Sequence, residues 1–86
     1  MQLSETDVAG CAAAMLAAVG GRDNVLSIAS CMTRLRLGLR DSAAVDEAGL
    51  RAAGAAGVLR RAGGEVHVVI GAGVHRLARE MEKLVQ

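Results

Sequence analysis

The sequence predicts an α+β fold of two layers, with its helices and strands in the order αββαββα. Three segments carry apolar residues at helical spacing on one face, and four shorter segments have the composition of strands. The clearest strand is the alternation of arginine and leucine between residues 33 and 40. Because each helix has one apolar stripe and the sheet has one apolar face, we expect a two-layer sandwich. The second face of the sheet is then open to a partner.

The first helix is predicted over residues 4–19. Ser4 and Asp7 approximate a capping box, the middle is rich in alanine, and a pair of glycines after Val19 ends the helix. The residues expected on its buried face are Val8, Cys11, Ala12, Met15 and Val19. Its cysteine therefore fits a core position, which is common for this residue type.

The later elements follow from alternation, capping residues and glycine positions. In order, they are a strand over 24–29, a tight turn through 30–32, a strand over 33–40, a polar turn over 41–44, a helix over 45–53, strands over 57–61 and 65–70 joined by a turn at 62–64, and a helix over 73–84. The buried stripe of the last helix is expected to contain Val74, Leu77, Ala78, Met81, Leu84 and Val85, while Arg76, Arg79, Glu80 and Lys83 face water.

Composition limits the classes of function. The chain has 86 residues, 52% of them hydrophobic and none aromatic, and its formal net charge is +1. Without aromatic side chains for base stacking and without a strong positive charge, a nucleic-acid partner is not predicted. The two cysteines lack zinc-site spacing, so neither a metal site nor a cofactor is expected. The start of the chain does not resemble a signal peptide, and the apolar run 11–19 is too short to cross a bilayer, so a reduced, cytoplasmic setting is expected.

The most informative stretch is Cys31-Met32-Thr33-Arg34-Leu35-Arg36-Leu37. In an extended strand, Arg34 and Arg36 point to one face and the leucines to the other. The expected result is a cationic face at the end where Cys31 lies. Arginine favours the thiolate form of a nearby cysteine and matches the geometry of a phosphoryl group. The stretch therefore predicts a cysteine that carries a phosphoryl group, with Thr33 offering a hydroxyl to a phosphoryl oxygen.

Simpler interpretations stay open for several of these residues. Alternating arginines also fit the solvated side of an antiparallel strand, and Thr33 also fits strand propensity. His67 lies in the middle of the fourth strand, on the same face as Glu65. A histidine on an open sheet face is most often a solvated polar residue. The alternative is that His67 is a neighbour of the site. His75, on the polar side of the last helix, is expected at the surface.

Other enzyme motifs are not matched. The tyrosine-phosphatase loop needs an arginine six positions after its cysteine, where this chain has Leu37. Gly71-Ala72-Gly73 lacks the third glycine and the lysine of a nucleotide-binding loop. A Ser/His/Asp triad is not excluded by the sequence, but no motif supports one.

From about Gly20 to the C-terminus, the chain strongly resembles the IIB domain of the glucose/N-acetylglucosamine family of the bacterial sugar phosphotransferase system. The stretch that begins at Cys31 is similar to the family's C-x-T-R-L-R-[VL] signature. The other segments that recur in the family's order are Asn24, Asp41, Val45-Asp46, Gly54-Ala55-Ala56-Gly57-Val58 and Ile70-Gly71. The chain differs in having Ala29 where the family often has an acidic residue, His67 where many members have glutamine, and a hairpin turn one residue longer.

The resemblance implies a single IIB domain over residues 1–86, with a four-stranded antiparallel sheet and three helices on one face. It also implies a phosphotransferase, of the class EC 2.7.1.-, with a phosphocysteine intermediate. Cys31 would take a phosphoryl group from phosphohistidine on a IIA domain or protein and transfer it to a sugar bound by the membrane IIC domain. Arg34 and Arg36 match the family's arginine pair, which supports the transfer. The chain is expected to be monomeric on its own and to associate with the inner face of the membrane through IIC, which selects the sugar.

Two other functions remain as alternatives. The face bearing Arg34 and Arg36 also suits a non-catalytic regulatory or binding module. A reactive cysteine also suits a redox sensor, although no resolving thiol lies near Cys31 in the sequence. A neighbouring gene for a IIC permease would favour transport over both alternatives.

Overall fold

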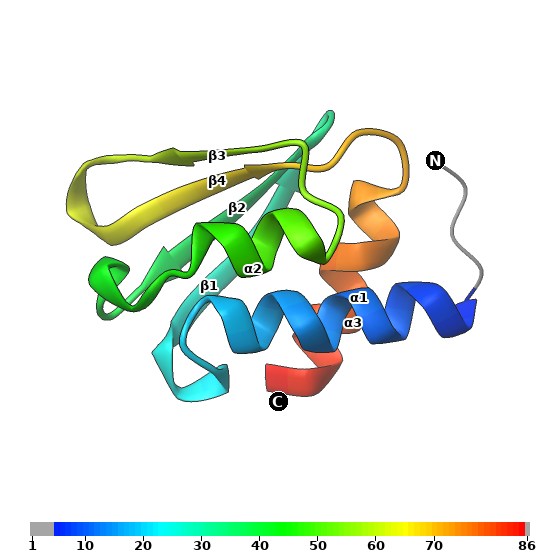
Figure 1. Cartoon of the computed structure of the whole chain (residues 1–86), viewed down its shortest axis with the longest axis horizontal. Helices are drawn as coiled ribbons and strands as arrows, with labels where there is room; N and C mark the ends of the chain where they lie inside the picture. The colour runs from blue at the N-terminus through cyan, green and yellow to red at the C-terminus, as the bar shows by residue number, and fades with distance from the viewer. Residues whose placement is uncertain (1–4, 86) are drawn as a thin grey trace.

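The computed structural model describes residues 5–85, with three α-helices on one face of a four-stranded sheet (Figure 1). The elements are α1 (Glu5–Ala18), β1 (Val25–Cys31), β2 (Arg34–Leu39), α2 (Glu47–Ala52), β3 (Gly57–Arg60), β4 (Glu65–Val69) and α3 (Val74–Val85). Short 3-10 turns are η1 (Arg22–Asn24), η2 (Ser42–Ala44) and η3 (Ala62–Gly64). The predicted α+β sandwich and the order αββαββα are therefore confirmed. The predicted capping residue Ser4 lies outside the described residues.

The sheet is antiparallel and has the strand order β1-β2-β4-β3. β1 and β2 form one hairpin, and β3 and β4 form a second one through η3. The pairing of β2 with β4 joins the two hairpins, so β2 and β4 lie in the middle of the sheet. Directly opposed residues of antiparallel strands project to the same face, so one row of side chains crosses all four strands.

The core lies between the sheet and the helices. The buried side chains of the two central strands are Leu35, Leu37, Leu39, Val66 and Val68. The buried side chains of the helices are Val8, Ala12, Met15, Leu16, Ala18, Leu50, Val74, Leu77, Ala78 and Met81, and Val19 is buried directly after α1. The alternation between residues 33 and 40 thus predicted the buried face of β2 correctly. The opposite face of β2 carries the exposed side chains of Arg34 and Arg36.

The predicted end of the first strand was wrong by two residues. β1 continues past Ala29, because Ser30 and Cys31 extend the ladder by pairing with Leu35 and Arg34. The sequence had predicted Cys31 in the turn, but it is the last residue of β1. This position ties the cysteine to the sheet through main-chain pairing.

Two details of the helices also differ from the prediction. α2 begins at Glu47, later than the predicted residue 45, because the Asp46 side chain caps it by accepting a hydrogen bond from the Gly49 amide at 3.1 Å. Leu84 was predicted on the buried stripe of α3, but it is 40% exposed. Val85, which was predicted on the same stripe, lies four residues after the buried Met81 and packs against the core.

Leu37→Ala is expected to lower the free energy of unfolding by about 2–5 kcal/mol. The reason is that Leu37 is 0% exposed at the centre of the sheet, so the shorter side chain leaves a cavity. Leu26→Ala is the matched control, because Leu26 of β1 is 57% exposed and its truncation should cost less than about 0.5 kcal/mol. Urea unfolding followed by circular dichroism measures both. Equal losses in the two variants would contradict the packing described above.

Candidate functional site

The open face of the sheet carries the residues that the sequence singled out. The register places Cys31 of β1 beside Arg34 of β2, and Arg36 of β2 beside His67 of β4. Arg34 and Arg36 are both exposed, whereas Leu35 between them is buried in the core. The alternation along β2 therefore brings two guanidinium groups to the face on which Cys31 ends its strand.

An open hollow of about 370 Å³ lies at this end of the face, and we call it the Cys31 pocket. The residues that line it are Cys31, Met32, Thr33, Arg34, Arg36 and His67. It thus brings together all five site residues proposed from the sequence, together with Met32. The pocket joins the end of β1, a turn and the two central strands, so its geometry depends on the pairing of β1, β2 and β4.

The two cysteines have different surroundings. Cys31 is a free, exposed thiol, whereas Cys11 of α1 is a free thiol that is partly buried. The Cys11 Sγ donates a hydrogen bond to the carbonyl oxygen of Ala53 at 2.6 Å and packs against the core. Cys11 therefore has a structural position, as the sequence predicted, and Cys31 is the thiol that a second molecule can approach.

The turn after Cys31 has an uncommon backbone conformation. Met32 has a φ of 55°, in the left-handed region, and is 83% exposed. The carbonyl oxygen of Thr33 accepts hydrogen bonds from the amides of Ile70 and Gly71 at 2.8 and 2.9 Å, which tie the turn to the end of β4. Sequence reasoning did not assign Met32 to the site, because a methionine in a short turn has no distinctive pattern.

His67 is less exposed than the sequence predicted. Its side chain is 12% exposed, although a solvated residue was expected. The reason is its place on the inner strand β4, where Arg36 and Leu59 are its register partners on the two neighbouring strands. The Nε2 atom of His67 hydrogen-bonds the Glu65 carboxylate. The Nδ1 atom is buried and has no hydrogen-bond partner among residues 5–85.

Glu65 connects His67 with Arg36. Its Oε1 atom contacts His67 Nε2 and lies 3.5 Å from Arg36 Nη2. The hydrogen bond from His67 lowers the pKa of the Glu65 carboxyl group, and the positive charge of Arg36 lowers it further. The sequence placed Glu65 on the same face as His67 but did not assign it to the site. The available signal was the spacing of two residues within one strand.

His75 lies at the surface, as the sequence predicted. It is exposed near the start of α3, and its Nδ1 atom lies 2.6 Å from the hydroxyl oxygen of Ser30 on β1. His75 does not line the Cys31 pocket. Of the two histidines, His67 is therefore the one that belongs to the candidate site.

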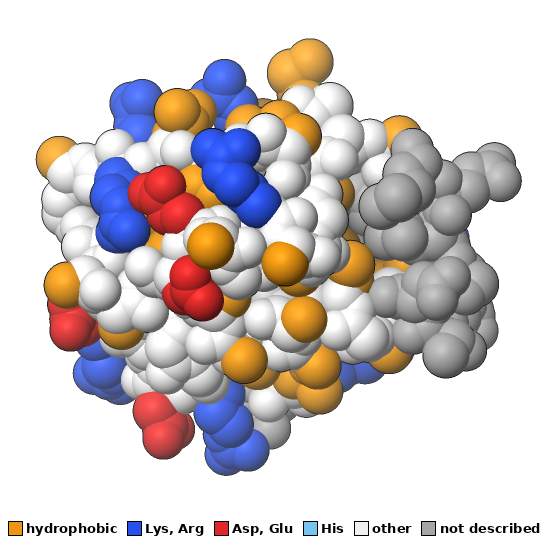
Figure 2. All heavy atoms as spheres, viewed as in Figure 1, with side chains coloured by type: hydrophobic (Ala, Val, Ile, Leu, Met, Phe, Trp, Pro, Cys, Tyr) orange, Lys and Arg blue, Asp and Glu red, His pale blue; other side chains and the backbone are white. Residues whose placement is uncertain are grey.

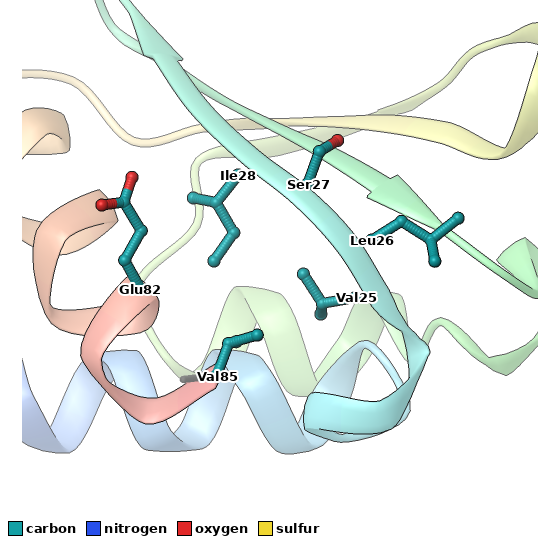
Figure 3. A pocket seen from close by; sticks show the side chains of 6 residues that line it. All are labelled: Val25, Leu26, Ser27, Ile28, Glu82 and Val85. Atoms are coloured by element: carbon teal, nitrogen blue, oxygen red, sulfur yellow. The ribbon is translucent and has the colours of Figure 1, made fainter.

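A second hollow, of about 200 Å³, lies between β1 and the last turn of α3. Figure 3 shows Val25 and Ile28 pointing from β1 toward Val85, with Glu82 beside them on α3. Its lining has neither a thiol nor a cation. The Cys31 pocket is therefore the better candidate for a site that binds an anion.

Over the helical side of the molecule, basic and acidic side chains are interspersed (Figure 2), in keeping with the small net charge.

Residues 5–85 offer neither a metal-binding cluster nor a membrane-spanning helix. That part of the chain contains no group of three histidine, cysteine, aspartate or glutamate side chains that could hold a metal ion. It also contains no helix that is both long and apolar enough to cross a membrane.

Residues 13–46, which include the Cys31 motif, match the model of the family described as phosphotransferase system, EIIB. The chain is 46% identical over 72 residues to the N-acetylglucosamine-specific EIICB component of Bacillus subtilis (strain 168), with 84% of this chain and 16% of that protein covered. It is 44% identical over 71 residues to the N-acetylglucosamine-specific EIIB component of Streptomyces coelicolor, with 83% of this chain and 91% of that protein covered. The chain thus spans about one sixth of the first relative and nearly the whole length of the second.

A solved structure has the same fold. It is the crystal structure of one domain of the phosphotransferase-system IIabc component from Clostridium difficile, with a TM-score of 0.82 and 24% identity. The match covers 95% of this chain and 86% of that one. The fold and the sequence relatives agree, and this chain belongs to the EIIB family of the phosphotransferase system. Within that family it is a IIB domain of the glucose/N-acetylglucosamine type, as the motif at Cys31 predicted.

Proposed function

We propose that this chain is a phosphoryl carrier in sugar uptake. Cys31 accepts a phosphoryl group from phosphohistidine on a IIA domain or protein and transfers it to a sugar bound by a membrane IIC domain. The observation that carries the proposal is the Cys31 pocket, where an exposed thiol and two exposed arginines line one open hollow. The relatives named EIICB and EIICBA support IIC and IIA as the partner classes.

The chemistry consists of two displacements at phosphorus. In the first, the Cys31 thiolate attacks, the S–P bond forms, the N–P bond of phosphohistidine breaks, and the histidine nitrogen keeps the electron pair. In the second, a sugar hydroxyl oxygen attacks, the S–P bond breaks, and the electron pair returns to the Cys31 sulfur while the hydroxyl proton is lost. The thiolate is restored, so the cycle has no net redox change. Catalysis of this kind consists mainly of positioning and charge stabilisation.

In this proposal four residues that line the pocket assist Cys31. Arg34 and Arg36 bind the phosphoryl oxygens, because the guanidinium fork matches oxygens held at tetrahedral phosphorus. Thr33, which also lines the pocket, offers its hydroxyl to a phosphoryl oxygen. His67 lies beside Arg36 on the next strand and lines the pocket with it.

An open pocket suits a carrier with two partners. Cys31 has to meet a donor and an acceptor in turn, and a deep cleft would obstruct both approaches. Contacts of this kind are expected to be small and transient. The chain would act at the cytoplasmic side of the membrane, where it meets the IIC domain.

The proposal is tested by incubating the protein with phosphoenolpyruvate, the general phosphotransferase proteins and a IIA domain, followed by intact-mass measurement. We expect the addition of one phosphoryl group, and peptide mapping under mild conditions should place it on Cys31. Phosphorylation confined to His67 or His75 would overturn the proposal. Unmodified protein under conditions in which the IIA domain is itself phosphorylated would also overturn it.

A further inference from the structure

Arg36 lines two hollows on the open face of the sheet. One is the Cys31 pocket, and the other, of about 180 Å³, we call the Glu65 hollow. The residues that line the Glu65 hollow are Ser27, Ala29, Arg36, Leu37, Gly38 and Glu65. The Arg36 side chain therefore lies between a thiol on one side and a carboxylate on the other.

Glu65 contacts two of the groups that line the Cys31 pocket, Arg36 and His67. The Arg36–Glu65 ion pair is 3.5 Å long, with the two side chains 49% and 38% exposed. The hydrogen bond from His67 Nε2 goes to the same carboxylate oxygen. No ion pair to Arg34 is present within the described residues, although Arg34 lines the same pocket. The two arginines therefore differ in whether a carboxylate already holds them.

We propose that Glu65 is a positioning residue that holds Arg36 and His67 while Cys31 is unphosphorylated and competes with the phosphoryl group for Arg36. This role rests on the proposed phosphorylation of Cys31. A phosphoryl group carries close to two negative charges at neutral pH, against one for a carboxylate, so it attracts Arg36 more strongly. Competition by Glu65 weakens this attraction. As a result, Arg36 does not bind the phosphoryl group so tightly that its transfer to the acceptor is prevented.

The surroundings of Glu65 keep the carboxylate available for this competition. The titratable groups in contact with it are Arg36 from β2 and His67 from its own strand, and the amide of Arg61 donates to its main-chain carbonyl at 2.7 Å. The hydrogen bond from His67 and the charge of Arg36 lower the pKa of Glu65. Glu65 thus stays charged at neutral pH, and the competition is lost when the pH falls through this lowered pKa.

The test compares Glu65→Gln and Glu65→Asp with the wild-type protein. Glu65→Gln removes the charge at nearly constant size, and we expect the equilibrium for transfer from IIA to shift about two- to fivefold toward phosphorylated Cys31, the size typical of an exposed ion pair. Onward transfer to sugar should slow by a similar factor, because the added attraction stabilises phosphorylated Cys31 more than it stabilises the transition state for transfer to the sugar. Glu65→Asp keeps the charge and should lie closer to the wild type. Glu47→Gln is the matched control, because Glu47 pairs with Arg60 at 3.0 Å away from the pocket and should change neither quantity.

A second measurement does not need phosphorylation. Sulfate is the anion of a strong acid and keeps its double negative charge at pH values where carboxyl groups become protonated. It can be titrated into the protein and its binding followed by NMR at the Arg34, Arg36 and His67 amides. We expect Glu65→Gln to bind sulfate about two- to fivefold more tightly at neutral pH. The difference should vanish on acidification, as the wild-type carboxylate becomes protonated. A purely structural role for Glu65 would not produce this pH profile.

The two hypotheses fail in different ways. If wild-type Cys31 is phosphorylated but Glu65→Gln changes neither the transfer equilibrium nor sulfate affinity, the role of Glu65 is overturned and the carrier function stands. If wild-type Cys31 takes up no phosphoryl group from phosphorylated IIA, the carrier function itself is overturned.

Discussion

Cys31→Ser is expected to abolish sugar phosphorylation, with a loss of at least about a thousandfold. A serine hydroxyl is a much weaker nucleophile than a thiolate, and the neighbouring arginines do not supply the general base that serine would need. The fold should persist, because Cys31 is exposed at the end of β1 and the exchange of sulfur for oxygen there should cost less than about 0.5 kcal/mol. The measurement is sugar phosphorylation in membranes that contain the matching IIC domain, together with intact mass of the variant.

Cys11→Ser is the matched control for this prediction. A serine hydroxyl can still donate to the Ala53 carbonyl oxygen that Cys11 Sγ contacts at 2.6 Å. We therefore expect this variant to take up one phosphoryl group and to retain sugar phosphorylation. Retained activity in Cys31→Ser with loss in Cys11→Ser would reverse the assignment of the two cysteines.

Arg34→Lys and Arg36→Lys are expected to separate the two half-reactions. Lysine keeps the positive charge but loses the two-pronged donor geometry that fits phosphoryl oxygens. Both arginines are exposed on the open face, so folding should change by less than about 0.5 kcal/mol. We expect phosphorylation of Cys31 by IIA to continue in part and transfer to sugar to fall much further. Delivery is the harder step, because a sugar hydroxyl is a poorer nucleophile than a thiolate and depends more on neutralised phosphoryl oxygens.

Both half-reactions have to be measured on the same preparations. Phosphorylation of Cys31 is followed by intact mass, and sugar phosphorylation is followed in membranes with the IIC domain. Arg60→Lys is a suitable control, because Arg60 is also an exposed sheet arginine but pairs with Glu47 outside the pocket. Full sugar phosphorylation by both Arg34→Lys and Arg36→Lys would show that the two arginines are ordinary surface residues.

Much of the fold could be predicted from local pattern. The alternation from residue 33 to 40 requires one buried and one open face, and Leu35, Leu37 and Leu39 are buried as that pattern demands. Glycines and capping residues located the ends of the elements to within one or two positions. The errors lay where pairing or packing overrides local signals. Cys31, for example, belongs to β1 because it pairs with Arg34 of β2. Leu84 is another such case, because it is 40% exposed at the edge of the helical stripe, whereas Val85 packs against the core as predicted.

For the candidate site, the sequence determined which groups are present and that Cys31, Arg34 and Arg36 share one face, because both properties follow from residue type and the two-residue period of a strand. Only the tertiary structure decided that β4 lies beside β2, which brings His67 and Glu65 to Arg36 from about thirty positions away in the chain. The partial burial of the His67 ring and the ion pair between Glu65 and Arg36 follow from that pairing. Strand order in a sheet depends on how all the helices and strands pack together, and no local pattern carries that information.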